Sequence, residues 1–563
     1  MPTIKIPLVG GSYSPRSLAV GAQTAINVYA EQIESQDEHY KNTAALYGSP
    51  GTLLFKNMTA IDAGFASIRG IWSGAGRLFV AGGNGTGSTN GRYCEIDTTT
   101  GALIGSVRTI SNATVNSLSN APAQFFPNGN QLMVISGGVA YIDNGAGPTA
   151  ITTNPWAGTV NTATILSTHL VTWVSGDKFS PIMVGQTITI NASPYTVQTF
   201  YDDELLGLTA TAGTQTGVAY SMTGPTLSAL TGAYLDGYYA VGIYNTKQYQ
   251  ISGLNNPTVS VWDGLDYSTK NTYPDNLNCV LSNDDLFLFG QNTTDVHRNT
   301  GGTFPFSKMD GAGFKLGAAS PWAPIAINSR VFFIAVSDQG RAVAYVLDGY
   351  TPVRISTHAE EYQWSAANLG VNCISYSEEH EGHYWWVINF GSGGTWQYDL
   401  VSGVWSQRAA WSGSAFTAYP FQFHTYVPEV GKHFVGGNGS SIIYESSLSL
   451  YSSNGSDIAW QRTLPHMYAG GKMQQFGRMT LEMQTGTVAS GAAPVVTRTW
   501  SDDRGQTFGH AETASIGVHD DFSIRVFWPG TSNSRDRVYR ITGIGQSKVA
   551  LISIEMEYQV LKA

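Results

Sequence analysis

The segment Ser501–Phe508 has the most distinctive spacing of polar side chains in this sequence. It reads Ser-Asp-Asp-Arg-Gly-Gln-Thr-Phe and fits the Ser-x-Asp-x-Gly-x-Thr-aromatic pattern known as the Asp-box. In such a turn the carboxylate accepts backbone N–H groups, the glycine takes a positive φ, and the aromatic ring packs the turn onto a sheet. The pattern therefore predicts a structural hairpin turn, without a catalytic role, that is formed by Ser501, Asp503, Gly505, Thr507 and Phe508.

A sialidase-like glycosidase would need more than this turn. Its site requires several arginines around a substrate carboxylate, an acid and nucleophile pair, and Asp-boxes in successive blades. This sequence has one Asp-box, and Arg525, Arg535, Arg537 and Arg540 near it could equally be cross-strand partners of aspartates. A sialidase-like glycosidase is therefore a disfavoured function for this chain.

The segment 378–383 has the spacing of a metal-binding sequence. It reads Glu-Glu-His-Glu-Gly-His, and its HxxH pair could collect a divalent metal ion if the chain were helical there. Gly382 and the aromatic run 384–386 instead favour a turn that leads into a strand. We therefore expect a solvated, charged turn and predict no metal site.

Other enzymatic signatures are missing from the sequence. It contains no GxSxG and no Walker A pattern, and its 11 histidines are scattered. We therefore predict no catalytic residues, no cofactor and no enzymatic activity.

The composition favours many short strands and argues against a nucleic-acid wrapper. The 563 residues include 64 glycines, 12% aromatic residues and only 12% charged residues, about half the usual charged share. The formal net charge of −10 is unsuited to wrapping DNA, which requires clustered lysines and arginines. The low charge instead predicts wide neutral contacts between subunits.

Cysteine usage and hydropathy predict where the chain is made. Cys94, Cys279 and Cys373 lie far apart and predict no disulfide framework. The N-terminus does not resemble a signal peptide, and no apolar run approaches the length of a membrane span. We expect synthesis in a reducing cytoplasm.

A pair of strands recurs along the chain with a period of about fifty residues. Each copy has an apolar run, a turn rich in Gly, Asn or Asp, and a second run that usually contains tyrosine or an acidic residue. The copies begin at Arg77, Gln131, Tyr238, Asp285, Val331, His383 and His433. This spacing is typical of β-propeller blades, so we predict an all-β propeller of six or seven blades; two stacked β-sandwiches are the alternative.

Segments outside the repeat complete the predicted domain organisation. The long interval between the second and third copies contains its own alternating strands, which indicates an inserted small β-domain. Long alternating strands after 457 indicate a C-terminal antiparallel β-sheet domain, a platform on which the N-terminal segment packs. The predicted parts are 1–50 (N-terminal segment), 51–162 (first blades), 163–224 (inserted domain), 225–456 (remaining blades) and 457–563 (C-terminal domain).

Two ends of the sequence resemble a known family. The stretch 23–31, with Asn27, Tyr29 and Glu31, and the turn Ser49-Pro50-Gly51-Thr52 resemble the opening of phage packaged-DNA stabilisation proteins. The stretches 500–505, 525–528 and 534–539 resemble the closing sheet of the same group and of tail tubular B proteins. The chain is thus similar to tail nozzle (tail hub) proteins of short-tailed double-stranded DNA phages.

The resemblance implies a mechanical role in the virion tail. It implies a homohexameric ring below the portal and adaptor proteins that retains packaged DNA and conducts it during ejection. Implied partners are tail spikes or fibres, a needle or plug, and, transiently and without sequence specificity, double-stranded DNA in the channel. This structural role is the first-ranked function. The second-ranked function is a receptor- or glycan-binding tail protein in which the inserted domain and aromatic loops hold sugar, and a sialidase-like glycosidase propeller is third.

Overall fold

The computed structural model is an all-β protein, as the sequence predicted. The residues it describes are all except 33–43, 115–120, 154–155, 166–167, 180–182, 223–226, 256–260, 265, 303, 338–339, 367–368, 370–372, 490 and 562–563. The chain divides into two compact units. Unit 1 comprises Met1–Ala123, Phe289–Thr294 and Gly311–Ala563, and unit 2 comprises Gln124–Leu288 and Asp295–Asp310.

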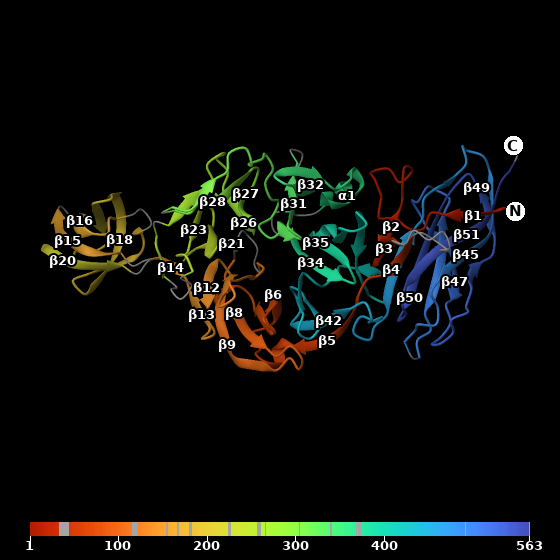
Figure 1. Ribbon diagram of the computed structural model, residues 1–563, viewed down its shortest axis with the longest axis horizontal. Helices are drawn as coiled ribbons and strands as arrows, with labels where there is room; N and C mark the ends of the chain where they lie inside the picture. The colour runs from red at the N-terminus through yellow and green to blue at the C-terminus, as the bar shows by residue number, and fades with distance from the viewer. Residues whose placement is uncertain are drawn as a thin grey trace. The chain divides into compact units, whose positions relative to one another are not determined.

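Four-stranded antiparallel sheets recur in unit 1 (Figure 1). One sheet is β6 (Ser67–Gly74), β7 (Arg77–Gly83), β8 (Gly87–Ile96) and β9 (Leu103–Asn112). A second is β30 (Ile325–Ile327), β31 (Arg330–Val336), β32 (Ala342–Asp348) and β33 (Thr351–Arg354). A third set is β34 (Ile374–His380), β35 (His383–Asn389), β36 (Thr395–Asp399) and β37 (Val404–Arg408). A fourth is β40 (Phe423–Val427), β41 (Lys432–Gly436), β42 (Ile442–Ser447) and β5 (Gly51–Asn57).

Four-stranded antiparallel sheets also recur between Gln124 and Lys308. One sheet is β10 (Gln124–Pro127), β11 (Leu132–Ser136), β12 (Val139–Asp143) and β13 (Pro148–Ala150). Another is β21 (Ala229–Leu235), β22 (Tyr238–Ile243), β23 (Gln248–Ile251) and β25 (Tyr267–Thr269). A further one is β26 (Leu277–Asn283), β27 (Asp285–Gly290), β28 (Thr294–Asn299) and β29 (Phe306–Lys308).

Each hairpin predicted from the sequence is the second and third strand of one of these sheets. The second strands, such as β11, β27 and β35, are buried along nearly their whole length. Neighbouring sheets cover both faces, so these strands are continuously apolar instead of alternating. First strands of successive sheets touch, as β30, β34, β40 and β6 do within unit 1 and β10, β21 and β26 within unit 2. This arrangement is typical of propeller blades.

Strand β5 completes a sheet whose other strands lie almost four hundred residues later. Gly51 pairs with Ser447 and Leu53 with Glu445 across β5 and β42. The sequence analysis placed residues from 51 onward in the first blades. The hydrogen-bonded ladder instead joins this segment to the sheet that begins at Phe423, which ties both ends of the repeated region together.

The long interval in the repeat forms a closed six-stranded barrel. Its strands are β15 (Trp156–Ile165), β16 (Thr168–Gly176), β17 (Thr187–Ile190), β18 (Ser193–Asp202), β19 (Leu205–Leu208) and β20 (Gln215–Met222). Buried residues such as Val160, Val171, Ile188, Val197 and Leu206 fill its interior. The first barrel strand begins at Trp156, before the expected start at 163, and the expected end at 224 lies outside the described residues.

The C-terminal part of unit 1 is a sandwich of two sheets. One contains β2 (Thr24–Ile26), β43 (Ile458–Thr463), β50 (Asp536–Gly545), β46 (Val495–Ser501), β47 (Gly509–Ser515) and β44 (Met467–Tyr468), and it is continuous with β37 through β2. The other contains β3 (Val28–Gln32), β4 (Ala44–Gly48), β51 (Ala550–Val560), β45 (Gln474–Met483), β48 (Val526–Trp528), β1 (Thr3–Ile6) and β49 (Thr531–Ser534). Figure 1 shows the red strands β1 to β4 among the blue C-terminal strands. Residues from both chain ends, including Ile6, Val28, Trp460 and Leu551, share one apolar core.

Short elements connect the sheets. Two strand pairs are β14 (Thr152–Thr153) with β24 (Val261–Trp262) and β38 (Ala410–Trp411) with β39 (Phe416–Thr417). Helix α1 (His358–Gln363) begins with a capping box in which Thr357 and Glu360 bond reciprocally. In the described part of the chain, 3-10 helices include η1 (Met58–Ala60), η3 (Trp364–Ala366) and η4 (Gly391–Gly393).

Candidate functional site

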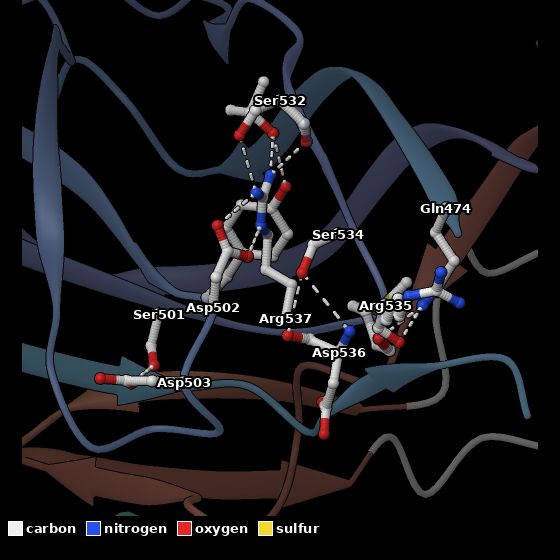
Figure 2. Close-up of polar contacts among 12 residues, drawn as sticks. Gln474, Ser501, Asp502, Asp503, Ser532, Ser534, Arg535, Asp536 and Arg537 are labelled. Atoms are coloured by element: carbon white, nitrogen blue, oxygen red, sulfur yellow. Dashed lines mark hydrogen bonds and ion pairs between the residues drawn. The ribbon is translucent and has the colours of Figure 1, made fainter. Parts of the chain in front are cut away.

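The Asp-box sequence forms a closed turn between β46 and β47. Asp503 accepts hydrogen bonds from the Ser501 hydroxyl at 2.5 Å and from the Thr507 backbone N–H at 2.9 Å and hydroxyl at 2.6 Å. The Gly505 N–H donates to Ser501 Oγ at 2.8 Å, and Gly505 has a φ of +87°. Figure 2 shows Ser501 and Asp503 facing each other in this turn.

The Asp503 carboxylate is held in its charged form by these bonds. The hydroxyls of Ser501 and Thr507 and the Thr507 backbone N–H lower the pKa of Asp503 to about 2. Phe508 ends the turn, and the Arg540 guanidinium lies 3.5 Å from the centre of its ring. The Asp503 carboxylate thus accepts hydrogen bonds from the turn itself, and it is no candidate general acid at neutral pH.

Arg537 lies beside the Asp-box turn and pairs with a carboxylate the sequence analysis did not single out. Its Nε and Nη2 donate to the two oxygens of Asp502, each at 2.7 Å (Figure 2). Nη1 donates to the Ser532 carbonyl at 2.8 Å, and Phe476 covers one face of the guanidinium with its ring centre at 4.7 Å. Burial disfavours the charge, yet the bonds to Asp502 outweigh it and raise the pKa of Arg537. The bidentate pair fixes β50 to the turn.

The four arginines near the Asp-box do not converge on a common point. Arg535 donates to the Gly471 carbonyl at 2.6 Å, Arg540 lies over Phe508, and Arg525 is exposed. Arg537 is occupied by Asp502. The arrangement offers no cluster of arginines for a substrate carboxylate, which a sialidase-like site requires.

The N-terminal residues behind the family resemblance form a polar node within unit 1. The Asn27 side-chain amide donates to the carbonyls of Ala409 and Ala459, each at 2.8 Å, and its oxygen accepts the Ala409 N–H at 2.9 Å. Asn27 also has a positive φ of 55°, a conformation that asparagine tolerates better than most residues. The asparagine therefore links three segments that are remote in sequence.

Tyr29 and Glu31 continue this node toward the β34–β35 hairpin. The Tyr29 ring packs against His383 and Trp385, with ring centres 5.0 and 4.9 Å apart. Glu31 lies 3.7 Å from His383 Nε2, while Nδ1 of the same histidine is 2.9 Å from Asp399. Tyr29 and Glu31, together with Lys548, line a polar cavity of about 320 Å³. The node positions the N-terminal strands against the repeated sheets.

Gly51 allows a backbone contact that no other residue could make. Its N–H donates to the Leu450 carbonyl at 3.1 Å, and a Cβ at this position would overlap that carbonyl and lie 2.7 Å from the Ser452 oxygen. The glycine of the Ser-Pro-Gly-Thr turn is thus required by close approach of two backbones. It directs the chain into β5.

The sequence analysis predicted a solvated turn at 378–383, and the predicted solvent exposure is wrong. The segment is a hairpin in which His380 pairs with His383 across Glu381 and Gly382, both with positive φ, so the predicted turn exists. However, Glu378, His380 and His383 are 2%, 5% and 5% exposed. They are covered by strands from other parts of the sequence, so the residues of this segment alone do not indicate the burial.

Sequence reasoning also missed a buried arginine that holds the N-terminus. Arg462 is 1% exposed, and its Nε and Nη1 donate to the Leu8 and Gly11 carbonyls, each at 2.8 Å. Burial lowers the pKa of Arg462 to about 10. Its place within β43, whose residues are mostly buried, was the available signal, but its partners lie near the other end of the sequence.

Comparison with protein families identifies this architecture. Residues 160–448 match the family model described as Bacteriophage P22 Gp10, beta-propeller, and residues 459–559 match the one described as Bacteriophage P22 Gp10, beta-sandwich. The chain belongs to the P22 Gp10 family. It is therefore a structural nozzle or hub protein of the phage tail, located in the virion, with a propeller and a C-terminal sandwich. The family that the sequence resembles is thus confirmed, and the second matched range includes the C-terminal stretches that carried the resemblance.

Other comparisons add little to this assignment. No curated protein matches the chain. Among solved structures, the N-terminal domain of Nup159 is 9% identical, with a TM-score of 0.35, and the match covers 76% of this chain and 99% of that one. Raptor from Chaetomium thermophilum is 9% identical, with a TM-score of 0.34, covering 68% of this chain and 29% of that one. No helix within the described ranges is long and apolar enough to cross a membrane.

Proposed function

We propose that six copies of this chain form the ring of a tail nozzle below the portal and adaptor proteins. The ring retains packaged DNA in the mature particle and conducts it during ejection. The observation that supports this proposal is membership of the P22 Gp10 family over both the propeller and the sandwich. The action is mechanical and forms no covalent bond.

The charge and composition of the chain suit a DNA conduit. The net charge is −10, and an acidic wall repels phosphates, so DNA can slide without adhering to it. Only 12% of residues are charged, which leaves wide neutral surfaces for contacts between copies. Both properties favour a passage with transient, sequence-independent DNA contact over a DNA-binding protein.

The domain organisation assigns a part to each segment of the proposed nozzle. The repeated sheets from β5 to β13 and from β21 to β42 form the propeller body, the barrel of β15 to β20 is an inserted domain, and the sandwich built from both chain ends is a platform for portal-side neighbours. The Asp-box turn of Ser501, Asp503, Gly505, Thr507 and Phe508 has a folding role in that platform. Tail spikes or fibres and a needle or plug attach to the ring.

The decisive experiment measures assembly and position together. Native mass spectrometry of the purified protein, with and without adaptor, is combined with negative-stain images of the same samples and of immunogold-labelled virions. We expect a ring with the mass of six 60.4-kDa chains and label at the tail. A persistent monomer with adaptor present, or label elsewhere on the particle, would overturn the proposed ring.

A genetic test addresses DNA retention. Particles assembled without this protein are expected to package DNA and then release it, and adding the purified protein to freshly packaged heads is expected to prevent the release. DNase sensitivity of the packaged genome reports the outcome. Heads that keep their DNA without the protein would contradict the retaining role.

A further inference from the structure

Three histidines from two neighbouring sheets meet within unit 1. His380 ends β34, His424 lies in β40, and His433 lies in β41. One ring nitrogen from each lies within 4.8 Å of one from the other two. His424 and His433 sit on adjacent strands of one sheet, and His380 reaches them from the sheet of β34 to β37.

The rings are arranged closely enough to share one small ligand. His424 Nε2 lies 3.0 Å from His433 Nδ1. The His380 and His433 rings stack with centres 3.9 Å apart, and the His424 and His433 rings with centres 5.2 Å apart. Nitrogens of ligands around a tetrahedral metal ion are separated by about 3.3 Å, given metal–nitrogen bonds of about 2.0 Å. Rotation of the stacked rings about their side-chain bonds would direct one nitrogen of each toward a common point.

A buried polar atom at this place lacks a partner. His380 is 5% exposed, and its Nε2 has no hydrogen bond within the described part of the chain. The nearest carboxylate is Glu378, whose Oε2 is 3.9 Å from that nitrogen and 2.7 Å from Arg408 Nη2. An unpaired buried nitrogen destabilises the fold, and coordination of a metal ion would give it a partner.

A carboxylate lies beside the three rings. Metal ligation uses the neutral form of each imidazole, which presents a free lone pair. The Glu378 carboxylate, which Arg408 contacts, is placed to balance the charge of a bound cation.

We propose that His380, His424 and His433 bind one divalent transition-metal ion of the Zn²⁺ class, which joins two neighbouring sheets of the repeated region. Three imidazoles favour Zn²⁺, Co²⁺ or Ni²⁺ over Mg²⁺ and Ca²⁺, which prefer oxygen ligands. The ion replaces the contact between His424 and His433 and gives His380 a partner. Glu378, held by Arg408, balances the charge from outside the ligand set. The site stabilises the fold and leaves the mechanical role unchanged.

The test uses the full chain and Zn²⁺ or Co²⁺ alone. The protein is stripped with a chelator, loaded with Zn²⁺, desalted and analysed for zinc, and a Co²⁺-loaded sample is examined for visible d–d absorption. We expect one zinc ion per chain, Co²⁺ bands typical of nitrogen ligands, and a melting temperature higher by on the order of 5 °C with Zn²⁺ than with chelator.

Variants assign the ion to these residues. His424→Gln and His433→Gln are expected to abolish retained zinc, and His358→Gln, whose side chain is 88% exposed on α1, is the matched control and should retain it. A wild-type chain that keeps no zinc and shows no Co²⁺ bands overturns the proposal. So does a folded His424→Gln, His433→Gln double variant that keeps as much zinc as wild type. If the variants misfold, the Co²⁺ spectrum of the wild-type chain decides the question. Absorption bands typical of nitrogen ligands support the proposal, and bands typical of oxygen ligands alone overturn it.

Discussion

The pair of Asp502 and Arg537 should contribute far more to stability than a similar pair near the surface. Both oxygens of Asp502 accept from the guanidinium at 2.7 Å, while the Arg537 side chain is fully buried and that of Asp502 is 43% exposed. We propose a double-mutant cycle with Asp502→Ala, Arg537→Met and both together. The cycle isolates the coupling free energy between the two side chains.

The expected magnitude follows from the dielectric environment. Two unit charges about 4 Å apart attract by about 4 kcal/mol at an effective dielectric constant of about 20 and by about 1 kcal/mol in bulk water. Water reaches Asp502 but not Arg537, so the coupling should lie between these limits, at about 2–3 kcal/mol. Asp502→Ala alone should be strongly destabilising because it leaves a buried guanidinium without its counter-charge.

A matched control exists in the same chain. Arg77 and Glu95 form the same bidentate geometry, with bonds of 2.9 and 2.7 Å, but the Arg77 side chain is 48% exposed. Its cycle, with Arg77→Met and Glu95→Ala, should give about 0.2–1 kcal/mol. The control coupling should also fall more steeply when salt is added, because exposed charges are screened.

Denaturant unfolding of the full chain provides the free energies. Trp500, whose ring centre lies 5.4 Å from the Arg537 guanidinium, reports unfolding of the sandwich by fluorescence, and circular dichroism reports the remainder. A coupling below about 1 kcal/mol for Asp502 and Arg537, or one no larger than the control, would refute the argument from burial.

Three further outcomes test other features of the fold. Gly51→Ala should lower the unfolding free energy by at least about 3 kcal/mol, since the new methyl group overlaps the Leu450 carbonyl. Gly509 has open space around it, so the control Gly509→Ala should change the unfolding free energy by less than about 0.5 kcal/mol. Similar values for the two variants would contradict the backbone contact at Gly51. Burial lowers the pKa of His297 from 6.5 to about 4, so the unfolded chain binds the extra proton and stability should fall by up to about 3 kcal/mol as the pH drops through this window; pH-dependent urea unfolding of His297→Gln should lack that component, and an unchanged pH dependence would refute it. Carboxyl NMR titration should place the pKa of Asp503 near 2, and a value near the ordinary 4 or so would show that the turn does not hold its hydrogen bonds in solution.

Local pattern was sufficient to predict the repeated sheets. Strand pairs such as those beginning at Gln131 and Val331 have apolar runs and a turn between them, and hairpin partners are close in sequence. The first strand of each pair, which is the second strand of its sheet, is covered on both faces and so stands out as a continuous apolar run. The family was likewise visible in short sequence stretches, and the family comparison confirmed the family.

The wrong expectation at 378–383 has a specific cause. The hairpin itself was predicted correctly because Gly382 favours a turn. The exposure was not, because His380 is covered by His433 and Trp385, and the strand that bears His433 lies fifty residues further along the chain. Charge in a short stretch indicates solvent contact only when no other strand packs over it.

By itself, the sequence determined the all-β class, the repeated hairpins, the Asp-box turn sequence and the family, because each depends on neighbouring residues or on short recognisable stretches. Tertiary structure alone decided that β5 completes the sheet of β42, that Arg462 holds the N-terminal carbonyls, and that His380 meets His424 and His433. These contacts join residues that are tens to hundreds of positions apart. Hydrogen-bonding groups of an edge strand accept any partner of suitable geometry, so the choice among distant partners is made by the packing of the whole domain.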